Sequence, residues 1–179
     1  CAQDDIARVF EPGASPPSQR LEALSLLKDA GIPAGVFLLP VIPFVTDKPD
    51  IMGPTLSRIQ KSGADFCLFG GMTLKPGKQK EFFRQRLSLF NKDLGYLYEH
   101  IYTGDPYGSL SKEYYTSIQE TFNMLIRRFP VPERIPLRLF DGVLSENDKV
   151  SVLLDHLDYY HKSRGKSSPY GYASYTVSQ

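Results

Sequence analysis

The spacing of hydrophobic and polar residues changes several times along this chain, and each spacing predicts a helix or a strand. Between Ser15 and Gly31, leucines recur at helical spacing, which predicts a helix with Ser15 as its N-cap and Pro16 as its first residue. Residues 34–42 are continuously apolar and bounded by prolines. We therefore expect them to form a strand that is covered on both faces.

The alternation of helix and strand then repeats. Residues 51–61 carry apolar side chains at helical spacing, and 65–72 form a second short apolar run after Gly63. Elements in this order, joined by short links, favour parallel strands with right-handed crossovers. The pattern therefore predicts an α/β fold.

The second half of the chain is predicted to be mostly helical. Apolar residues at spacings of three and four predict one helix over 82–94 and another from Ser111 to Pro130. Pro136 restricts the alternating stretch 134–140 to an edge strand or an extended linker.

A capping-box pattern marks the start of the last predicted helix. Ser145 precedes Asp148 by three residues, the spacing at which the two side chains can satisfy each other's backbone N–H groups. The apolar residues that this helix is expected to bury are Val150, Leu153, Leu154 and Leu157. The tail 165–179 has the composition of a flexible terminus.

Composition excludes several classes of protein. With 179 residues and 41% hydrophobic content, the chain can form one ordinary domain. The net charge of +1 gives no general attraction to nucleic acid or to an anionic membrane. No apolar run is long enough to cross a bilayer, and no signal-peptide pattern opens the sequence, so we expect a cytoplasmic protein. Because the chain begins with Cys1 and not with Met, we expect it to be a piece of a longer polypeptide.

Motifs with a defined chemistry are almost absent. The two cysteines, Cys1 and Cys67, have neither a disulfide pattern nor metal-ligand spacing, and Cys67 is expected to be a small buried hydrophobe. The three histidines, His100, His156 and His161, are expected on helix surfaces. We therefore predict no catalytic residue and no metal ligand in this chain.

Three loop features leave alternatives open. Glu11 and Arg20 are close enough in sequence to form a charge-assisted pair, which either fixes its loop or orients a ligand. Gly70-Gly71 ends the second strand, where a tight exit is favoured over close approach of a ligand. Lys75 and Lys78 flank the following turn, where a solvated loop is favoured over an anion site.

The amino-acid sequence of residues 1–95 resembles that of one enzyme family. The matching segments are Phe10-Glu11-Pro12, Ser15-Pro16, Arg20, Glu22-Ala23, Ala30-Gly31, Pro33, Gly35, Pro40-Val41-Ile42 and Phe69 to Leu74. They are similar to the second half of the spore photoproduct lyase-related proteins of the radical SAM superfamily. The resemblance implies the C-terminal portion of a partial (βα)6 TIM-like barrel over 1–95, a helical extension over 96–164 and a flexible tail over 165–179.

The resemblance also implies cofactors. Members of this family hold a [4Fe-4S] cluster through a Cys-x-x-x-Cys-x-x-Cys loop and cleave S-adenosylmethionine to a 5′-deoxyadenosyl radical, which abstracts hydrogen from a substrate. This chain lacks that loop, so we expect cluster and catalysis only in a longer parent. What carries over is part of the S-adenosylmethionine site, with Leu39 and Pro40 beside the adenine and with Arg20 and Glu11 bracing the loop over the ribose and methionine end.

Two alternatives come from other functional classes. One alternative is a nucleic-acid-binding module, because the enzyme after which the family is named repairs a DNA lesion. A nucleic-acid substrate would also be compatible with the radical SAM interpretation. A non-catalytic assembly domain is the other. An open parallel sheet leaves a strand edge unprotected, so we expect self-association through that edge.

Overall fold

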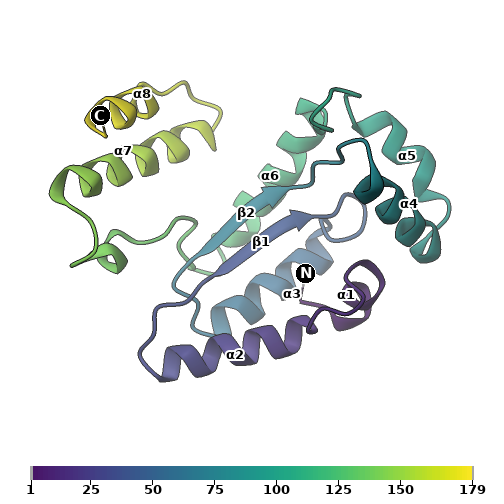
Figure 1. Cartoon of the computed structure of the whole chain (residues 1–179), viewed down its shortest axis with the longest axis horizontal. Helices are drawn as coiled ribbons and strands as arrows, with labels where there is room; N and C mark the ends of the chain where they lie inside the picture. Colours follow the sequence, from purple (N-terminus) through teal and green to yellow (C-terminus); the bar gives the residue numbers. More distant parts are fainter. Residues whose placement is uncertain (1, 179) are drawn as a thin grey trace. The chain divides into compact units, whose positions relative to one another are not determined.

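The computed structural model describes residues 2–178, and these form two compact units that divide between Glu133 and Arg134 (Figure 1). The helices up to residue 126 belong to the first unit, so the helical extension that the resemblance implies from residue 96 stays a prediction.

The first unit alternates helices and strands in the predicted order. Its helices are α1 (Asp4–Phe10), α2 (Pro17–Asp29), α3 (Pro49–Lys61), α4 (Lys78–Phe90), α5 (Leu94–Ile101) and α6 (Lys112–Ile126). Its strands, β1 (Val36–Val41) and β2 (Cys67–Gly71), pair in parallel, with Leu38 opposite Phe69. A mixed α/β fold with parallel strands is therefore confirmed.

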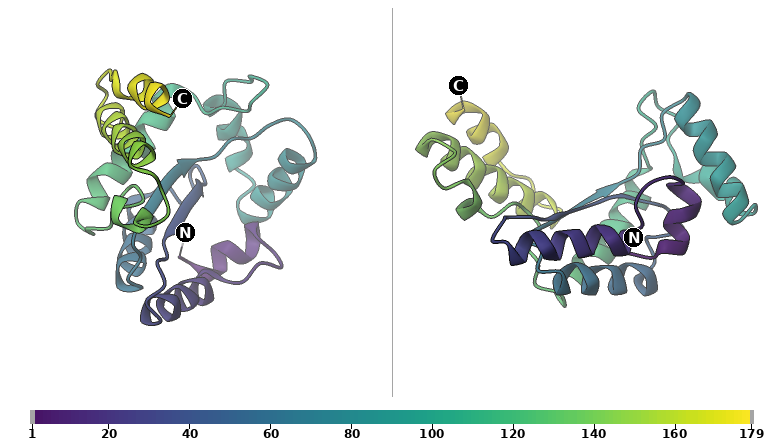
Figure 2. Two further views of the ribbon diagram at one scale, coloured as in Figure 1. Left: turned by 60° about the vertical axis from the view of Figure 1, so that its left-hand side comes forward. Right: turned by 60° about the horizontal axis from the view of Figure 1, so that its bottom comes forward.

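Helices α3 and α6 provide the main core. Met52, Leu56 and Ile59, the predicted inner face of α3, are all buried. Phe122 of α6 stacks on Phe69 of β2 with ring centroids 4.6 Å apart. In the right view of Figure 2, α2 and α3 lie on the same side of the two strands. The helices thus cover one face of the small sheet.

The other face of β1 is open, so the prediction of a strand covered on both faces is wrong for the described chain. Phe37 is 60% exposed and Leu39 is 51% exposed, whereas Leu38 and Val41 are buried. The pleat sends successive side chains to opposite faces, which explains why Leu38 is buried while Phe37 and Leu39 are exposed, but it does not by itself explain the burial of Val41, three residues after Leu38. Pro40 has no N–H to contribute to the ladder, and the pairing with β2 is irregular between Leu38 and Val41.

Two predicted helix boundaries differ from those observed. Pro16, not Ser15, is the N-cap of α2, because Pro17 already occupies the first helical position. The predicted helix 82–94 is two helices, since Asn91 takes an extended conformation and its side chain accepts a hydrogen bond from Asp93 N. Helix α6 begins after Ser111, whose side chain caps Tyr114 N, and it ends before Pro130.

The second unit contains a short 3₁₀ helix, η1 (Leu137–Phe140), followed by α7 (Glu146–Lys162) and α8 (Tyr170–Val177). The predicted edge strand over 134–140 is wrong, because the chain turns into η1 directly after Pro136. The predicted capping box at the start of α7 is confirmed, with Ser145 and Asp148 bonded in both directions.

Helix α8 stands where composition predicts a flexible tail. It packs on α7, where Ser174 Oγ donates to the Ser151 carbonyl at 3.1 Å and Gly171 N donates to Asp158 Oδ1 at 3.2 Å. The predicted inner face of α7 is not buried. Val150, Leu153 and Leu157 are between 44% and 46% exposed, whereas the hydrogen bonds with α8 are made by Ser151 and Asp158.

Candidate functional site

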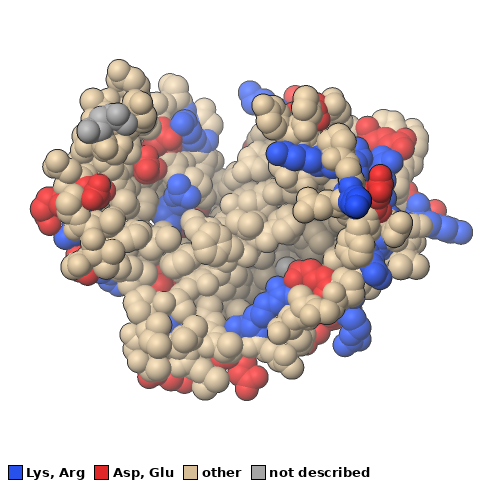
Figure 3. All heavy atoms as spheres, in the orientation of Figure 1, with Lys and Arg blue, Asp and Glu red and all other residues tan. Residues whose placement is uncertain are grey.

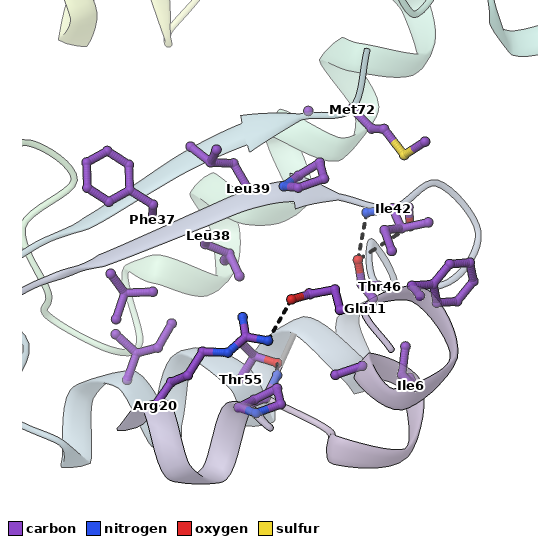
Figure 4. A pocket seen from close by; sticks show the side chains of 18 of the residues that line it. Ile6, Glu11, Arg20, Phe37, Leu38, Leu39, Ile42, Thr46, Thr55 and Met72 are labelled. Atoms are coloured by element: carbon purple, nitrogen blue, oxygen red, sulfur yellow. Dashed lines mark hydrogen bonds and ion pairs between the residues drawn. The ribbon is translucent and has the colours of Figure 1, made fainter. Parts of the chain in front are cut away.

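A cavity of about 730 Å³ lies between β1 and the first two helices. Its walls come from α1, α2 and β1, and from the segment that follows β2. Figure 3 shows a hollow on this face with basic and acidic side chains beside it, and Figure 4 shows it from close by. Glu11, Arg20, Leu39 and Pro40, the four predicted site residues, all line this cavity.

The predicted pair of Glu11 and Arg20 is present. Arg20 Nη2 donates to Glu11 Oε2 at 2.6 Å, and Arg20 Nε donates to the Ser15 carbonyl at 2.6 Å. The pair therefore closes the loop between α1 and α2. Among the described residues, Arg20 Nη1 and Glu11 Oε1 have no further partner, so both charged groups keep a free position at the half-exposed end of the cavity.

Two threonines that line the cavity, Thr46 and Thr55, bond within the protein. Thr46 Oγ1 accepts a hydrogen bond from Ile42 N at 2.7 Å. Thr55 Oγ1 donates to the Ile51 carbonyl at 2.8 Å and accepts from Ala2 N at 3.0 Å. Sequence reasoning missed both threonines. The position of Thr46 just after a predicted strand was the available signal, because strand ends carry binding residues in α/β folds.

Close packing around the end of β2 explains why two glycines, Gly70 and Gly71, stand there, as predicted. A Cβ atom at Gly70 would lie 3.1 Å from Leu39 Cβ, and one at Gly71 would lie 3.0 Å from the Tyr115 ring. A side chain at either position would press on these neighbours. The glycines therefore permit the tight exit of β2, and Gly71 also lines the cavity.

A cluster of tyrosines, with Tyr98 buried and Tyr114 half-buried, supports the loop after β1. Tyr114 O–H donates to Asp47 Oδ2 at 2.6 Å, and Tyr98 O–H donates to the Pro43 carbonyl at 2.7 Å. Burial raises the pKa of both phenols well above the usual tyrosine value, so they remain hydrogen-bond donors. Nothing in the sequence pattern indicated this cluster, because its members come from α5, α6 and the loop.

The remaining candidate residues lie away from this cavity. Cys67 is buried as predicted, and burial raises the pKa of its thiol to about 12. His100 is exposed on α5, and His156 and His161 lie on α7, in accord with helix-surface positions. Lys75 Nζ is 5.6 Å from the centre of the Tyr107 ring.

Two absences hold for residues 2–178. No group of three or more His, Cys, Asp or Glu side chains is placed to hold a metal ion. No helix in the same range combines the length and the apolar character that crossing a membrane requires. Cys1 lies outside the described residues.

Comparison with known proteins finds distant relatives. No family model matches this chain, and no solved structure matches it. Uncharacterized proteins of Mycobacterium bovis and Mycobacterium tuberculosis are 26% identical over 125 residues, which covers 70% of this chain and 36% of theirs. An uncharacterized protein of Acidianus two-tailed virus is 32% identical over 88 residues, covering 48% of this chain and 29% of its own. The chain thus spans about a third of the length of the curated relatives it matches.

Proposed function

We propose that this chain supplies one wall of an S-adenosylmethionine site in a larger radical SAM protein related to spore photoproduct lyase. In this proposal β1 and β2 belong to a partial (βα)6 barrel. The observation that carries it is the convergence of Glu11, Arg20, Leu39 and Pro40, all implied by the resemblance, on one cavity.

The chemistry of the cavity suits such a ligand. Leu39 and Pro40 form an apolar wall near the carboxyl end of β1, and ligands of parallel α/β sheets bind at that end. At the half-exposed end, the Arg20 guanidinium and the Glu11 carboxylate complement the carboxylate and the ammonium of the methionine moiety. These four residues would hold the adenine at one end and the amino acid at the other.

The open face of β1 supports the barrel within the proposal. In a βα barrel the helices surround the strands, and alternate strand side chains fill the interior. Phe37 and Leu39 are exposed on the face of β1 opposite α3, where barrel-interior side chains would lie. Further strands closing over them would remove this apolar surface from water.

The residues of this chain do not fit the iron–sulfur cluster. The sequence contains two cysteines, and Cys67 is buried with a thiol whose pKa is raised to about 12. A cluster of this type needs accessible thiolates at close spacing. In the proposal these ligands belong to another part of the parent. S-adenosylmethionine and the cluster are bound by the parent, and neither is expected to bind to this chain by itself.

The test is anaerobic reconstitution, with iron and sulfide, of a longer protein that contains this chain. We expect cluster absorbance and formation of 5′-deoxyadenosine from S-adenosylmethionine. The Arg20→Ala variant should raise the KM for S-adenosylmethionine by about tenfold or more, because a charge-assisted contact is lost. The chain alone should show neither absorbance nor product.

The matched control is Arg84→Ala. Arg84 forms a similar exposed pair, with Nη2 3.8 Å from Glu99 Oε1, but it does not line the cavity. Its replacement should leave the KM unchanged. Absence of 5′-deoxyadenosine from a protein with an intact cluster would overturn the proposal, and so would equal effects of the two arginine variants.

A further inference from the structure

One side of α7 carries an apolar stripe that is largely exposed. The stripe consists of Val150, Leu153 and Leu157, at the spacings of three and four that place side chains on one face of a helix. These three side chains keep between 44% and 46% of their surface in contact with water. A contiguous apolar face of this kind marks an interaction surface.

The other sides of α7 are occupied by its own unit. Helix α8 runs beside α7 in Figure 1, and its hydrogen bonds reach Ser151 and Asp158, which lie on a different side of α7 from the stripe. The Arg134 guanidinium lies 4.4 Å from the centre of the Tyr159 ring, on a further side. In the part of the second unit that the structure describes, no other helix is left to cover the stripe.

Charged residues of opposite sign stand at the two ends of the stripe. Glu146 is four residues before Val150 and Arg164 is seven residues after Leu157, so both continue the same spacing. Arg164 directly follows Ser163, the C-cap of α7. It forms no ion pair among the described residues, and Glu146 keeps 89% of its side chain exposed. The stripe therefore begins with an acidic residue and ends with a basic one.

This order makes the stripe complementary to itself in an antiparallel pair of helices. In a two-fold dimer each contact occurs twice, because residue i of one copy meets residue j of the other and j meets i. The residues that face each other are Leu153 and Leu157, Val150 and Tyr160, and Glu146 and Arg164. A parallel pair would instead place Glu146 beside Glu146 and Arg164 beside Arg164, where like charges repel.

We propose that the stripe is the dimer interface of this chain, with α7 of a second copy packed antiparallel on it and Glu146 paired with Arg164 at both ends. Each copy contributes one helix, which is at the small end of specific interfaces, so the dimer is reversible. None of these residues lines the cavity of the first unit. The proposal therefore does not rest on S-adenosylmethionine binding.

Sedimentation equilibrium of the full chain between about 1 µM and about 1 mM measures this dimer, and we expect its fraction to rise over that range. Leu153→Lys should weaken dimerisation by about tenfold or more, because it buries an ammonium in the contact twice per dimer. The matched control is Tyr172→Lys. Tyr172 lies on α8 and is 79% exposed, so its replacement should leave the dimer unchanged.

Exchange of charges tests the antiparallel alignment. Glu146→Arg alone and Arg164→Glu alone should each weaken dimerisation by about fivefold or more, because each replaces two ion pairs by like charges. A chain with both changes should recover the affinity of the unaltered chain, since both ion pairs form again with their signs reversed. In a parallel pair, each single change would replace one repulsion by another and leave the affinity unchanged.

Three results would overturn the proposal. A chain that stays monomeric at about 1 mM would favour cover of the stripe by another segment of a longer polypeptide. A dimer that Leu153→Lys does not weaken would favour the strand edge, which the sequence analysis expects to self-associate. Unchanged affinity in both single charge variants would exclude the antiparallel pair. The measurement on the unaltered chain and the recovery in the double variant do not depend on the folding of Leu153→Lys.

Discussion

Tyr114 and Asp47 form a partly buried polar contact outside the cavity lining. Among the described residues, Asp47 Oδ1 has no partner, so the Tyr114 hydroxyl on Oδ2 is the main compensation for burying this side chain. We expect Tyr114→Phe to lower the free energy of unfolding by about 1–3 kcal/mol, measured by urea denaturation. Tyr115→Phe is the control, because its hydroxyl makes only an exposed 3.4 Å contact with Gln119. It should cost less than about 0.5 kcal/mol, and equal losses would contradict the assignment.

A buried cysteine thiol and several tyrosine hydroxyls with raised pKa values predict how the free energy of unfolding changes in alkaline solution. Burial raises the pKa of Cys67 from 9.0 to about 12, and it raises the pKa of Tyr98, Tyr102 and Tyr114 above the usual value of 10.0. Above these ordinary values the unfolded chain binds fewer protons than the folded chain. The contribution to stability is therefore fully present below about pH 9 and declines as the pH rises further. Urea denaturation between about pH 8 and about pH 11 checks this, and a free energy of unfolding that rises over this range would contradict it.

At the scale of elements, the capping box of α7 is a local device whose effect can be isolated. Ser145 Oγ accepts from Asp148 N at 3.2 Å, and Asp148 Oδ2 accepts from Ser145 N at 3.3 Å. Ser145→Ala should cost about 1 kcal/mol, which is about a fivefold faster amide exchange in the first turn of α7. Ser178→Ala, near the end of α8, should leave this exchange unchanged. An unchanged rate in the Ser145 variant would show that packing alone holds the helix start.

Capping patterns, helical spacing and short apolar runs are local signals that the sequence contains, and they account for most of the predicted elements. Helical spacing located α2, α3 and α6, and the short apolar runs located β1 and β2. The same signals failed where a single residue redirects the backbone, as Asn91 does between α4 and α5. They also failed for α8, whose composition is that of a flexible tail but whose packing on α7 holds it as a helix.

At the scale of the whole molecule, the two units are expected to differ in independence. Both hydrophobic clusters are built from residues between Ile6 and Val131, all in the first unit. A chain ended after Glu133 should therefore retain cooperative thermal unfolding, with a Tm within about 5 °C of the full chain. Circular dichroism during heating measures this. Loss of a cooperative transition would show that residues 134–179 contribute to the core of the first unit.

The sequence by itself determined the order of elements from α2 to β2, the parallel pairing of β1 with β2, the pairing of Glu11 with Arg20 and the burial of Cys67. These features depend on spacing between near neighbours, which a linear pattern contains. Only the tertiary structure decided that Phe37 and Leu39 face solvent, that Asp47 meets Tyr114, and that four candidate residues share one cavity. Those outcomes depend on which distant segments pack on a face of a helix or strand. Hydrophobic periodicity predicts which face is apolar, but it does not show which segment, if any, packs against that face.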